Sequence, residues 1–175
     1  MKTQWSVDQS HSEVTFKVKH MMIANVTGIM KEYSITAETE GDDFTTGTVK
    51  FVGKTASIDT GNEQRDAHLG SEEFFDVAKY PEITFTSTGT EKVEAGNYRL
   101  LGDLTIRGIT KKIDLFIEFG GIQKDPWGNT KAGFTVTGKI NRKDFGLNWN
   151  AALEAGGVMV SEDVKVACEI EMIRS

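Results

Sequence analysis

Cysteine and proline are both scarce in this chain of 175 residues, which has one cysteine and two prolines. The single cysteine, Cys168, excludes an internal disulfide and agrees with a reducing compartment. No run of proline, serine or like charges marks a linker between domains. With 38% hydrophobic residues, the chain can bury a sizeable core. We therefore expect residues 1–175 to form one domain.

Long apolar runs are also missing. No segment approaches the roughly 20 apolar residues that cross a bilayer, and the opening MKTQWSVDQS has no apolar stretch of signal-peptide length. We expect no integral membrane segment and a cytoplasmic location. Acidic residues outnumber basic ones, 26 to 20, and the net charge of −6 repels phosphate backbones and anionic lipid surfaces. We therefore expect no nucleic-acid partner.

Apolar and polar residues alternate along most of the chain, a pattern typical of half-buried β-strands. In the opening segment QSHSEVTFKVKH, residues 9–20, the even-numbered apolar positions end in His20. Seven further strands are expected near residues 27–39, 47–58, 82–93, 98–107, 112–119, 131–141 and 161–173. Long strands with short antiparallel connections stack as two sheets or close into a barrel, and closure removes the exposed edges. The pattern predicts an antiparallel all-β fold.

The segment 60–81 breaks the alternation. Thr60 and Glu63 have the spacing of a capping box, and Gly70 can end a helix in the left-handed conformation. Ser71 can cap a second helical turn. We expect one or two short helices between the third and fourth predicted strands.

Metal-site and catalytic motifs are absent from the sequence. The three histidines, His11, His20 and His68, lie far apart, and no His/Glu or Cys/His spacing typical of a metal site occurs. There is no GxSxG elbow, no Walker loop and no GxGxxG after a strand. We expect no metal, no cofactor and no enzymatic activity, although dispersed residues could still form a catalytic site.

Arg65, Asp66 and His68 form the most enzyme-like cluster. In a helix, Asp66 and His68 point to different sides, which disfavours a local catalytic dyad. We favour a capped helix in which Arg65 and Asp66 pair with neighbouring loops. The alternative is a hydrolase site, with these residues as charge clamp, orienter and base.

Four segments spread between about Trp5 and Ile173 carry a more specific pattern. They are VDQSHSEVTFKVKH, RDAHLGSEEFFDVAKYPEITFTST, LTIRGITKKI and GFTVTGKINRKDFGLNW. With these segments the chain resembles the YceI-like family, which belongs to the lipocalin-like polyisoprenoid-binding proteins. The resemblance implies an extended eight-stranded antiparallel barrel around an elongated apolar cavity. It also implies a long isoprenoid, a quinone-like chain or another amphipathic lipid as ligand, and no enzymatic activity. For Arg65, Asp66 and His68 it implies, as the alternative to a capped helix, a lid contact or a wall near the pocket mouth.

Strand parity selects the residues that we expect to contact such a ligand. They are Phe16, Val18, His20, Phe51, Phe85, Leu104, Leu115, Ile117, Phe134, Val136, Ile140, Val166, Cys168 and Ile170. Two aromatic residues of the helical segment, Phe74 and Phe75, are added. One can plug the barrel end while the other contacts the ligand, and we favour plugging over ligand contact. A bulge in any strand would reverse part of this selection.

Three features of the expected cavity wall leave alternatives open. His20 is either a histidine satisfied by a buried partner or water, or a polar group that hydrogen bonds to a lipid head group. Cys168, on the inward face of the last strand, is expected to be an inert wall residue. Apolar side chains after the first strand serve ordinary packing or an adaptable rim, with packing the default: Met21, Met22, Ile23 and Met30.

The favoured function is therefore non-catalytic binding, transport or storage of a polyisoprenoid, an isoprenoid quinone or another amphipathic lipid. The alternative is an enzyme that acts on a lipid-like or quinone-like substrate, with His20 or His68 as general base. A filled barrel that serves as an interaction module is a third hypothesis. The sequence leaves both a monomer and a homodimer open.

Overall fold

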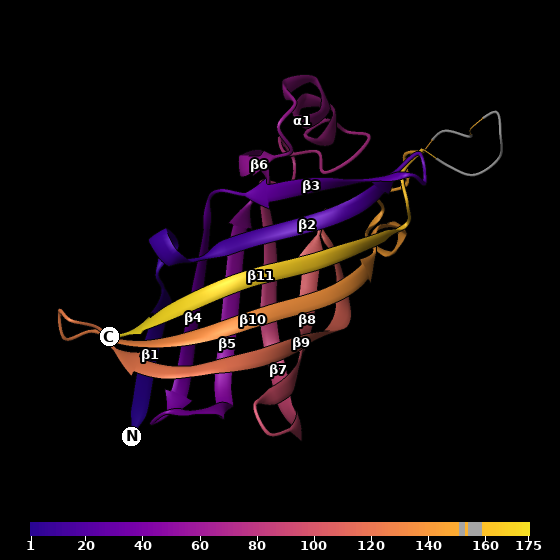
Figure 1. Ribbon diagram of the computed structural model, residues 1–175. Coiled ribbons are helices and arrows are strands. Elements are labelled where there is room, and N and C mark those ends of the chain that lie inside the picture. The colour runs from indigo at the N-terminus through magenta and orange to yellow at the C-terminus, as the bar shows by residue number, and fades with distance from the viewer. Residues whose placement is uncertain (151–152, 154–158) are drawn as a thin grey trace.

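The computed structural model describes residues 1–150, 153 and 159–175. In this part of the chain eleven strands form one continuous sheet, and eight of them close into an antiparallel barrel (Figure 1). The barrel closes because the last strand pairs with the first. In their order around the barrel, the strands are β1 Lys2–Val7, β4 Tyr33–Glu40, β5 Asp43–Lys54, β7 Glu82–Glu94, β8 Asn97–Ile106, β9 Ile109–Lys124, β10 Thr130–Asn141 and β11 Asp163–Arg174. The predicted eight-stranded barrel is confirmed.

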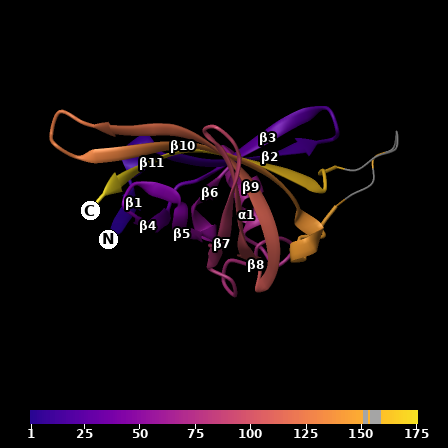
Figure 2. The ribbon, with the colours of Figure 1, turned by 90° about the horizontal axis from the view of Figure 1, so that it is seen from below.

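Three more strands extend the sheet beyond this closure: β2 Glu13–His20, β3 Ala24–Met30 and β6 Ile58–Asp59. Strand β11 belongs to both parts, because its C-terminal end pairs with β1 and its N-terminal half pairs with β2. A 3-10 helix, η1 Gln9–His11, separates β1 from β2. The β2–β3 hairpin therefore projects from the barrel, on the side away from the β9–β10 hairpin (Figure 2).

Two of the predicted strands are divided in the structure. The segment near 27–39 comprises β3 and β4, which are separated at Lys31 and Glu32. The segment near 47–58 ends in the 3-10 helix η2, Thr55–Ser57, before β6 begins. Strand β1 was missed because it is short and has few alternating apolar positions. The strands from β7 onward agree with the expected ranges within a few residues, except that β9 is longer at both ends.

The helix α1, Glu63–Leu69, is the one α-helix in the described part of the chain, and it lies at one end of the barrel (Figure 1). Its N-cap is Asn62, whose side chain accepts a hydrogen bond from the backbone of Arg65 at 2.9 Å. The predicted capping box at Thr60 is therefore wrong, because Asn62 directly precedes the first turn. Within the described residues, no helix has the length and hydrophobicity needed to cross a bilayer.

The end of α1 also differs from expectation. Gly70 ends the helix with φ −77°, which is right-handed, so the expected left-handed conformation is wrong. Turns rather than a second helix follow, and the Ser71 hydroxyl donates to the His68 carbonyl at 2.6 Å instead of capping a new turn.

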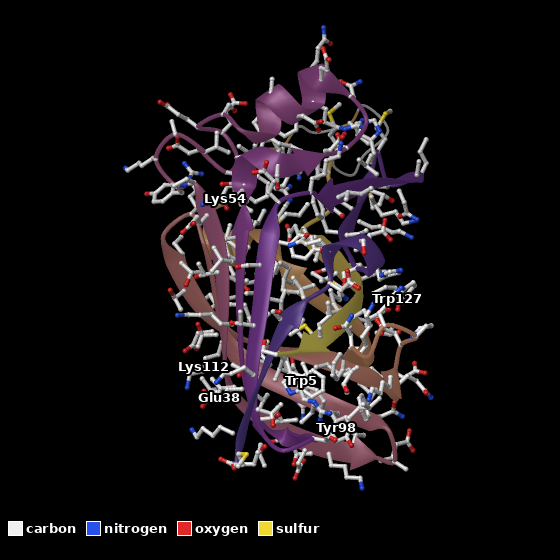
Figure 3. All side chains as sticks on the ribbon, turned by 90° about the vertical axis from the view of Figure 1, so that its left-hand side faces the viewer. Trp5, Glu38, Lys54, Tyr98, Lys112 and Trp127 are labelled. Carbon is white, nitrogen blue, oxygen red and sulfur yellow. The ribbon has the colours of Figure 1, made fainter. Side chains whose placement is uncertain are left out.

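Aromatic side chains pack the end of the barrel interior that lies away from α1. Trp5 is 1% exposed, and its indole nitrogen donates to Thr39 Oγ1 at 2.9 Å. The ring centroid of Phe44 lies 4.8 Å from that of Trp5 and 4.9 Å from that of Phe134. Figure 3 shows Trp5 toward this end of the barrel, with the Lys112 side chain on the outer face.

Candidate ligand-binding cavity

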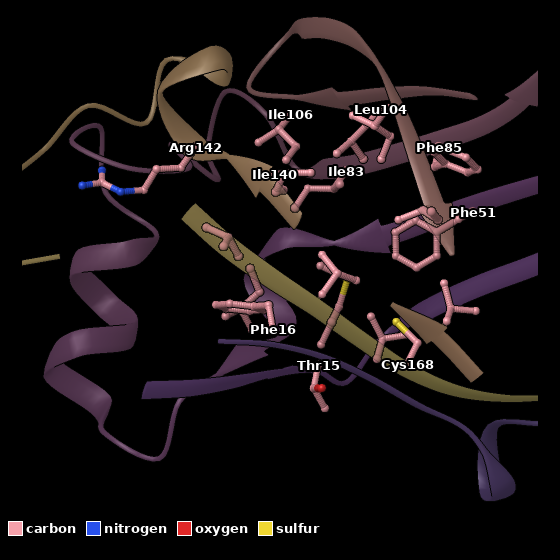
Figure 4. A pocket seen from close by; sticks show the side chains of 18 of the residues that line it. Thr15, Phe16, Phe51, Ile83, Phe85, Leu104, Ile106, Ile140, Arg142 and Cys168 are labelled. Carbon is pink, nitrogen blue, oxygen red and sulfur yellow. The ribbon is translucent and has the colours of Figure 1, made fainter. Parts of the chain in front are cut away.

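A cavity of about 730 Å³ runs through the barrel. Its walls are the inward faces of the barrel strands other than β1, together with β2 and β3, and most of the lining side chains are apolar. In Figure 4, Phe16, Phe51, Phe85 and Leu104 face the same interior space. The volume lies within the roughly 300–1,000 Å³ typical of sites for small molecules. A hollow interior argues against the filled-barrel hypothesis.

All sixteen residues selected from the sequence line this cavity. They are Phe16, Val18, His20, Phe51, Phe74, Phe75, Phe85, Leu104, Leu115, Ile117, Phe134, Val136, Ile140, Val166, Cys168 and Ile170. The β-bulges in β7 and at Gly133 and Phe134 of β10 do not change which of these side chains face the cavity. The side chain of Thr15 points away from Phe16, as alternation along β2 requires (Figure 4). That these side chains contact a ligand remains a prediction.

Glycines in the wall make room for large side chains to lie flat against it. Gly102 on β8 lies beneath the ring of Phe85, and Gly138 on β10 lies beneath Leu115. A Cβ atom at either glycine would overlap with the side chain above it. These side chains can therefore cover the wall without filling the lumen.

The buried guanidinium of Arg142 lies beside the cavity. Arg142 begins the 3-10 helix η3, Arg142–Phe145. Arg142 is 3% exposed, and burial lowers the pKa of its guanidinium. The guanidinium donates to four backbone carbonyls at 2.5–3.2 Å, those of Leu147, Trp149, Val160 and Ser161. Figure 4 shows the group directed away from the apolar side chains. Arg142 therefore fixes the chain segments that border this end of the cavity.

His20 lies at the end of β2 and lines the cavity, as its parity predicts. Its backbone forms an isolated antiparallel bridge with Val160, whose carbonyl also accepts from Arg142. Within the described residues, the imidazole has no hydrogen-bond or ion-pair partner. Among the described residues, His20 therefore has no buried protein partner.

The helix α1 uses two of its charged residues to hold the preceding loop. Asp66 accepts hydrogen bonds from the backbone nitrogen of Thr60 at 3.0 Å and from its hydroxyl at 2.5 Å. Arg65 donates to the hydroxyl and the carbonyl of Thr60, both at 2.7 Å. The favoured interpretation of Arg65 and Asp66 is confirmed, although Arg65 also lines the cavity.

His68 occupies a different environment on the same helix. Its Nε2 forms a hydrogen bond with the Glu73 carboxylate. Its ring lies edge-on to Phe74, with 5.0 Å between ring centroids, and to Trp149, with 4.9 Å. Because His68, Phe74 and Trp149 all line the cavity, they form an aromatic wall near α1. Phe74 is buried, as a plugging residue would be, whereas Phe75 is only partly buried.

Cys168 faces the cavity from β11. Burial raises the pKa of its thiol to about 11. The neutral thiol therefore predominates near neutral pH, which agrees with the expected inert wall residue.

A cluster of charged groups lies outside the cavity, around Lys131. Its ammonium is 2.9 Å from Asp8, 3.1 Å from Glu171 and 3.7 Å from Asp125. The hydrogen bond from Lys131, followed by that from His11, holds the pKa of the Asp8 carboxyl well below its usual range. Potential metal ligands of Asp8, His11 and Glu171 lie within 4.8 Å of one another, but the lysine already supplies the cation. We interpret the cluster as structural.

Several lining residues were not selected from the sequence. Ile83, Leu100 and Ile106 lie on predicted strands, so their parity could have identified them. Arg142 and Trp149 lie where the alternation of β10 has ended, and no periodic signal marks them.

Comparison with known proteins agrees with this geometry. Residues 5–172 match the YceI-like domain. The UPF0312 protein SA2479 of Staphylococcus aureus strain N315 is 39% identical over 171 residues, which cover 97% of this chain and 96% of the relative. The crystal structure of the Campylobacter jejuni YCEI protein is 35% identical, with a TM-score of 0.77 and coverage of 95% of both chains.

Two more distant structures show the same fold. Burkholderia cenocepacia BcnA has a TM-score of 0.81 at 21% identity, covering 94% of this chain and 98% of that protein. A polyisoprenoid binding domain from Saccharophagus degradans has a TM-score of 0.69 at 16% identity and covers 98% of both chains. Because the family match and the close relatives extend over nearly the whole sequence, the chain belongs to the YceI-like family.

Proposed function

We propose that the protein binds a long-chain apolar ligand with a modest polar head and transports or stores it without changing it chemically. A polyisoprenoid or an isoprenoid quinone fits this description, as does another amphipathic lipid. The observation that carries the proposal is the apolar cavity inside the barrel. Removing a hydrocarbon chain from water into such a cavity contributes about 25 cal/mol per Å² of buried apolar surface. The Saccharophagus degradans relative, described as polyisoprenoid-binding, supports the same ligand class.

The direct test is mass spectrometry of organic extracts from protein purified without detergent. We expect a long-chain lipid at a stoichiometry near one per chain, or uptake of an added polyprenol or isoprenoid quinone by the emptied protein. An empty protein that takes up neither compound in titrations would contradict the proposal.

Within this function, we assign His20 to the polar head of the ligand. The proposal is supported by the position of the ring at the end of an apolar strand face and by its lack of a partner among the described residues. His20→Ala should weaken binding of a polar-headed isoprenoid by about 2- to 12-fold, since one hydrogen bond contributes roughly 0.5–1.5 kcal/mol. Binding of the hydrocarbon analogue should change little.

His11→Ala is the matched control, because His11 is exposed and bonds to Asp8 outside the cavity. Equal losses of affinity for the two ligands in His20→Ala would count against a head-group role.

The predicted compartment of the protein is still the cytoplasm.

The second candidate function is an enzyme acting on a lipid-like or quinone-like substrate, with His20 or His68 as general base. One observation favours His68, because Glu73 is within hydrogen-bond distance of its Nε2 and could share the proton. The test is product analysis after incubation with an isoprenoid quinone. Turnover that is lost in both His68→Gln and Glu73→Gln would support the enzyme, and quantitative recovery of unchanged quinone would contradict it.

A further inference from the structure

The β2–β3 hairpin ends in an apolar tip formed by Met21, Met22 and Ile23. These residues are 41%, 60% and 81% exposed. The tip directly follows His20, and it is joined to the cavity border by a hydrogen bond from the Met21 nitrogen to the Met159 carbonyl at 2.7 Å. Contiguous exposed apolar side chains at such a border indicate an interaction surface.

The backbone of the tip is strained. Met21 and Met22 have φ values of 52° and 61°, and the Ile23 nitrogen donates to the His20 carbonyl across the turn. Three residues, 21–23, separate the paired His20 and Ala24, and the first two have the positive φ that favours Asn-Gly in type I′ turns. Two methionines therefore occupy positions where they cost stability, and they expose apolar surface there. Strain of this kind points to a function of the side chains.

Basic residues lie directly behind the tip on the outer face of the sheet. Lys17 on β2 pairs in register with Lys165 on β11, which in turn pairs with Lys139 on β10. This lysine row places like charges directly opposite one another, an arrangement that destabilises a sheet. Asp163 neutralises Lys139, but within the described residues Lys17, Lys19 and Lys165 have no ion-pair partner.

We propose that the apolar tip docks the protein on an anionic lipid bilayer surface, with the lysine row and Lys19 facing the lipid phosphates. Strand geometry places Lys19 about 7 Å and Lys17 about 13 Å behind Met21. Side chains that insert about 5–10 Å to the acyl boundary therefore leave these ammonium groups near headgroup depth. The net charge of −6 opposes a random approach, so the local basic surface also orients the protein.

The docked orientation brings the His20 end of the cavity toward the membrane. The docking itself follows from the hairpin surface alone, whereas its use for loading a lipid rests on the proposed function. Val166→Phe separates the two, because it narrows the cavity and leaves the tip intact. This variant should still dock on vesicles even where ligand binding is lost.

The test is co-sedimentation of the full chain with vesicles of phosphatidylcholine alone or with about one-third phosphatidylglycerol. The variant Met21→Asn/Met22→Gly/Ile23→Thr installs the preferred turn and removes the apolar surface. It should unfold at an equal or higher urea concentration yet bind both kinds of vesicle at least tenfold more weakly. We expect affinity for the anionic vesicles to fall roughly 100-fold in the variant Lys17→Gln/Lys19→Gln/Lys165→Gln. Its affinity for vesicles of phosphatidylcholine alone should not change.

The matched control is Lys50→Gln/Lys92→Gln/Lys124→Gln, which changes the net charge equally on β5, β7 and β9. It should bind anionic vesicles like the unmodified chain. The inference is overturned if the unmodified chain binds neither kind of vesicle, or if the tip variant binds as well as the unmodified chain. It is also overturned if the two lysine variants lose equal affinity for anionic vesicles. The same holds if the tip variant keeps its affinity for vesicles and only dissociates a dimer or releases a protein partner.

Discussion

The ring of Phe16 on β2 lies over Gly28 on the adjacent strand β3, and the two residues are paired in register. A Cβ atom at Gly28 would overlap with three carbons of that ring. The glycine therefore lets the ring lie flat against the wall, and a large aromatic side chain adds apolar surface without crossing the lumen. The width of the cavity depends on this pair.

Gly28→Ala should push the Phe16 ring into the lumen and weaken binding of a long-chain isoprenoid. The double variant Gly28→Ala/Phe16→Leu should recover much of the affinity, because the smaller side chain fits beside the added methyl group. Gly133→Ala is the matched control, since a Cβ atom there has no neighbour within 4 Å. Unchanged affinity in Gly28→Ala would show that the ring does not border the ligand.

Val166→Phe tests whether the barrel is hollow. Val166 lies opposite Gly138 and Phe16 on the inward face of β11. In a filled core the larger ring would cost about 1–3 kcal/mol of unfolding free energy. In a hollow barrel the ring takes up ligand space, so we expect little change in the urea midpoint of lipid-free protein and a clear loss of long-chain binding.

The neighbouring exposed residue supplies the control for this variant. Ala167→Phe adds the same ring to the outside of the same strand and should leave binding unchanged. A large fall in stability for Val166→Phe would favour a filled barrel. Unchanged stability together with unchanged binding would place Val166 away from the ligand.

Arg142→Met should lower the free energy of unfolding by roughly 2–4 kcal/mol, because it leaves several buried carbonyls without donors. Arg142→Lys should recover only part of this loss, since one ammonium cannot reproduce the planar fork of the guanidinium. Urea unfolding measures both values. Lys143→Met, which removes a surface cation paired with Glu162, should stay within about 0.5 kcal/mol of the unmodified chain. Full stability in Arg142→Lys would contradict the assigned role.

Cys168 reports on the cavity through its reactivity. With its pKa raised to about 11 from an ordinary value of 9.0, the thiol should react with iodoacetamide at pH 8 about 100-fold more slowly than in the urea-unfolded chain. The rate should rise as pH approaches 11, and a bound long-chain ligand should lower it further. The same shift predicts that folding stability falls between about pH 9 and 11, because the unfolded chain loses its thiol proton first. Cys168→Ala should remove that contribution.

The wall of the cavity was predictable because strand periodicity directly encodes which side chains share a face. Phe16, Val166 and Cys168 follow from alternation alone. The division between β3 and β4 was also encoded, since the buried positions change from even to odd numbers between Met30 and Tyr33. That change of phase was missed because apolar residues continue on both sides of it.

Other features depend on contacts that no local pattern records. Arg142 reaches carbonyls up to 19 residues away, so its role becomes visible only when the chain is folded. Asn62 and Thr60 both have side chains that can cap the N-terminus of α1. Asn62 caps it because Thr60 is already bonded to Asp66. The strained turn at Met21 and Met22 runs against residue preference, which local rules could not anticipate.

Strand β11 joins β1 and β2 across more than 140 residues of intervening chain. No shorter stretch can enclose the cavity, so a nascent chain on the ribosome holds an open apolar trough until β11 has been synthesised. Contacts of such sequence separation also form slowly. Newly made protein should therefore depend on chaperones, or on early capture of a lipid, more than its final stability would suggest.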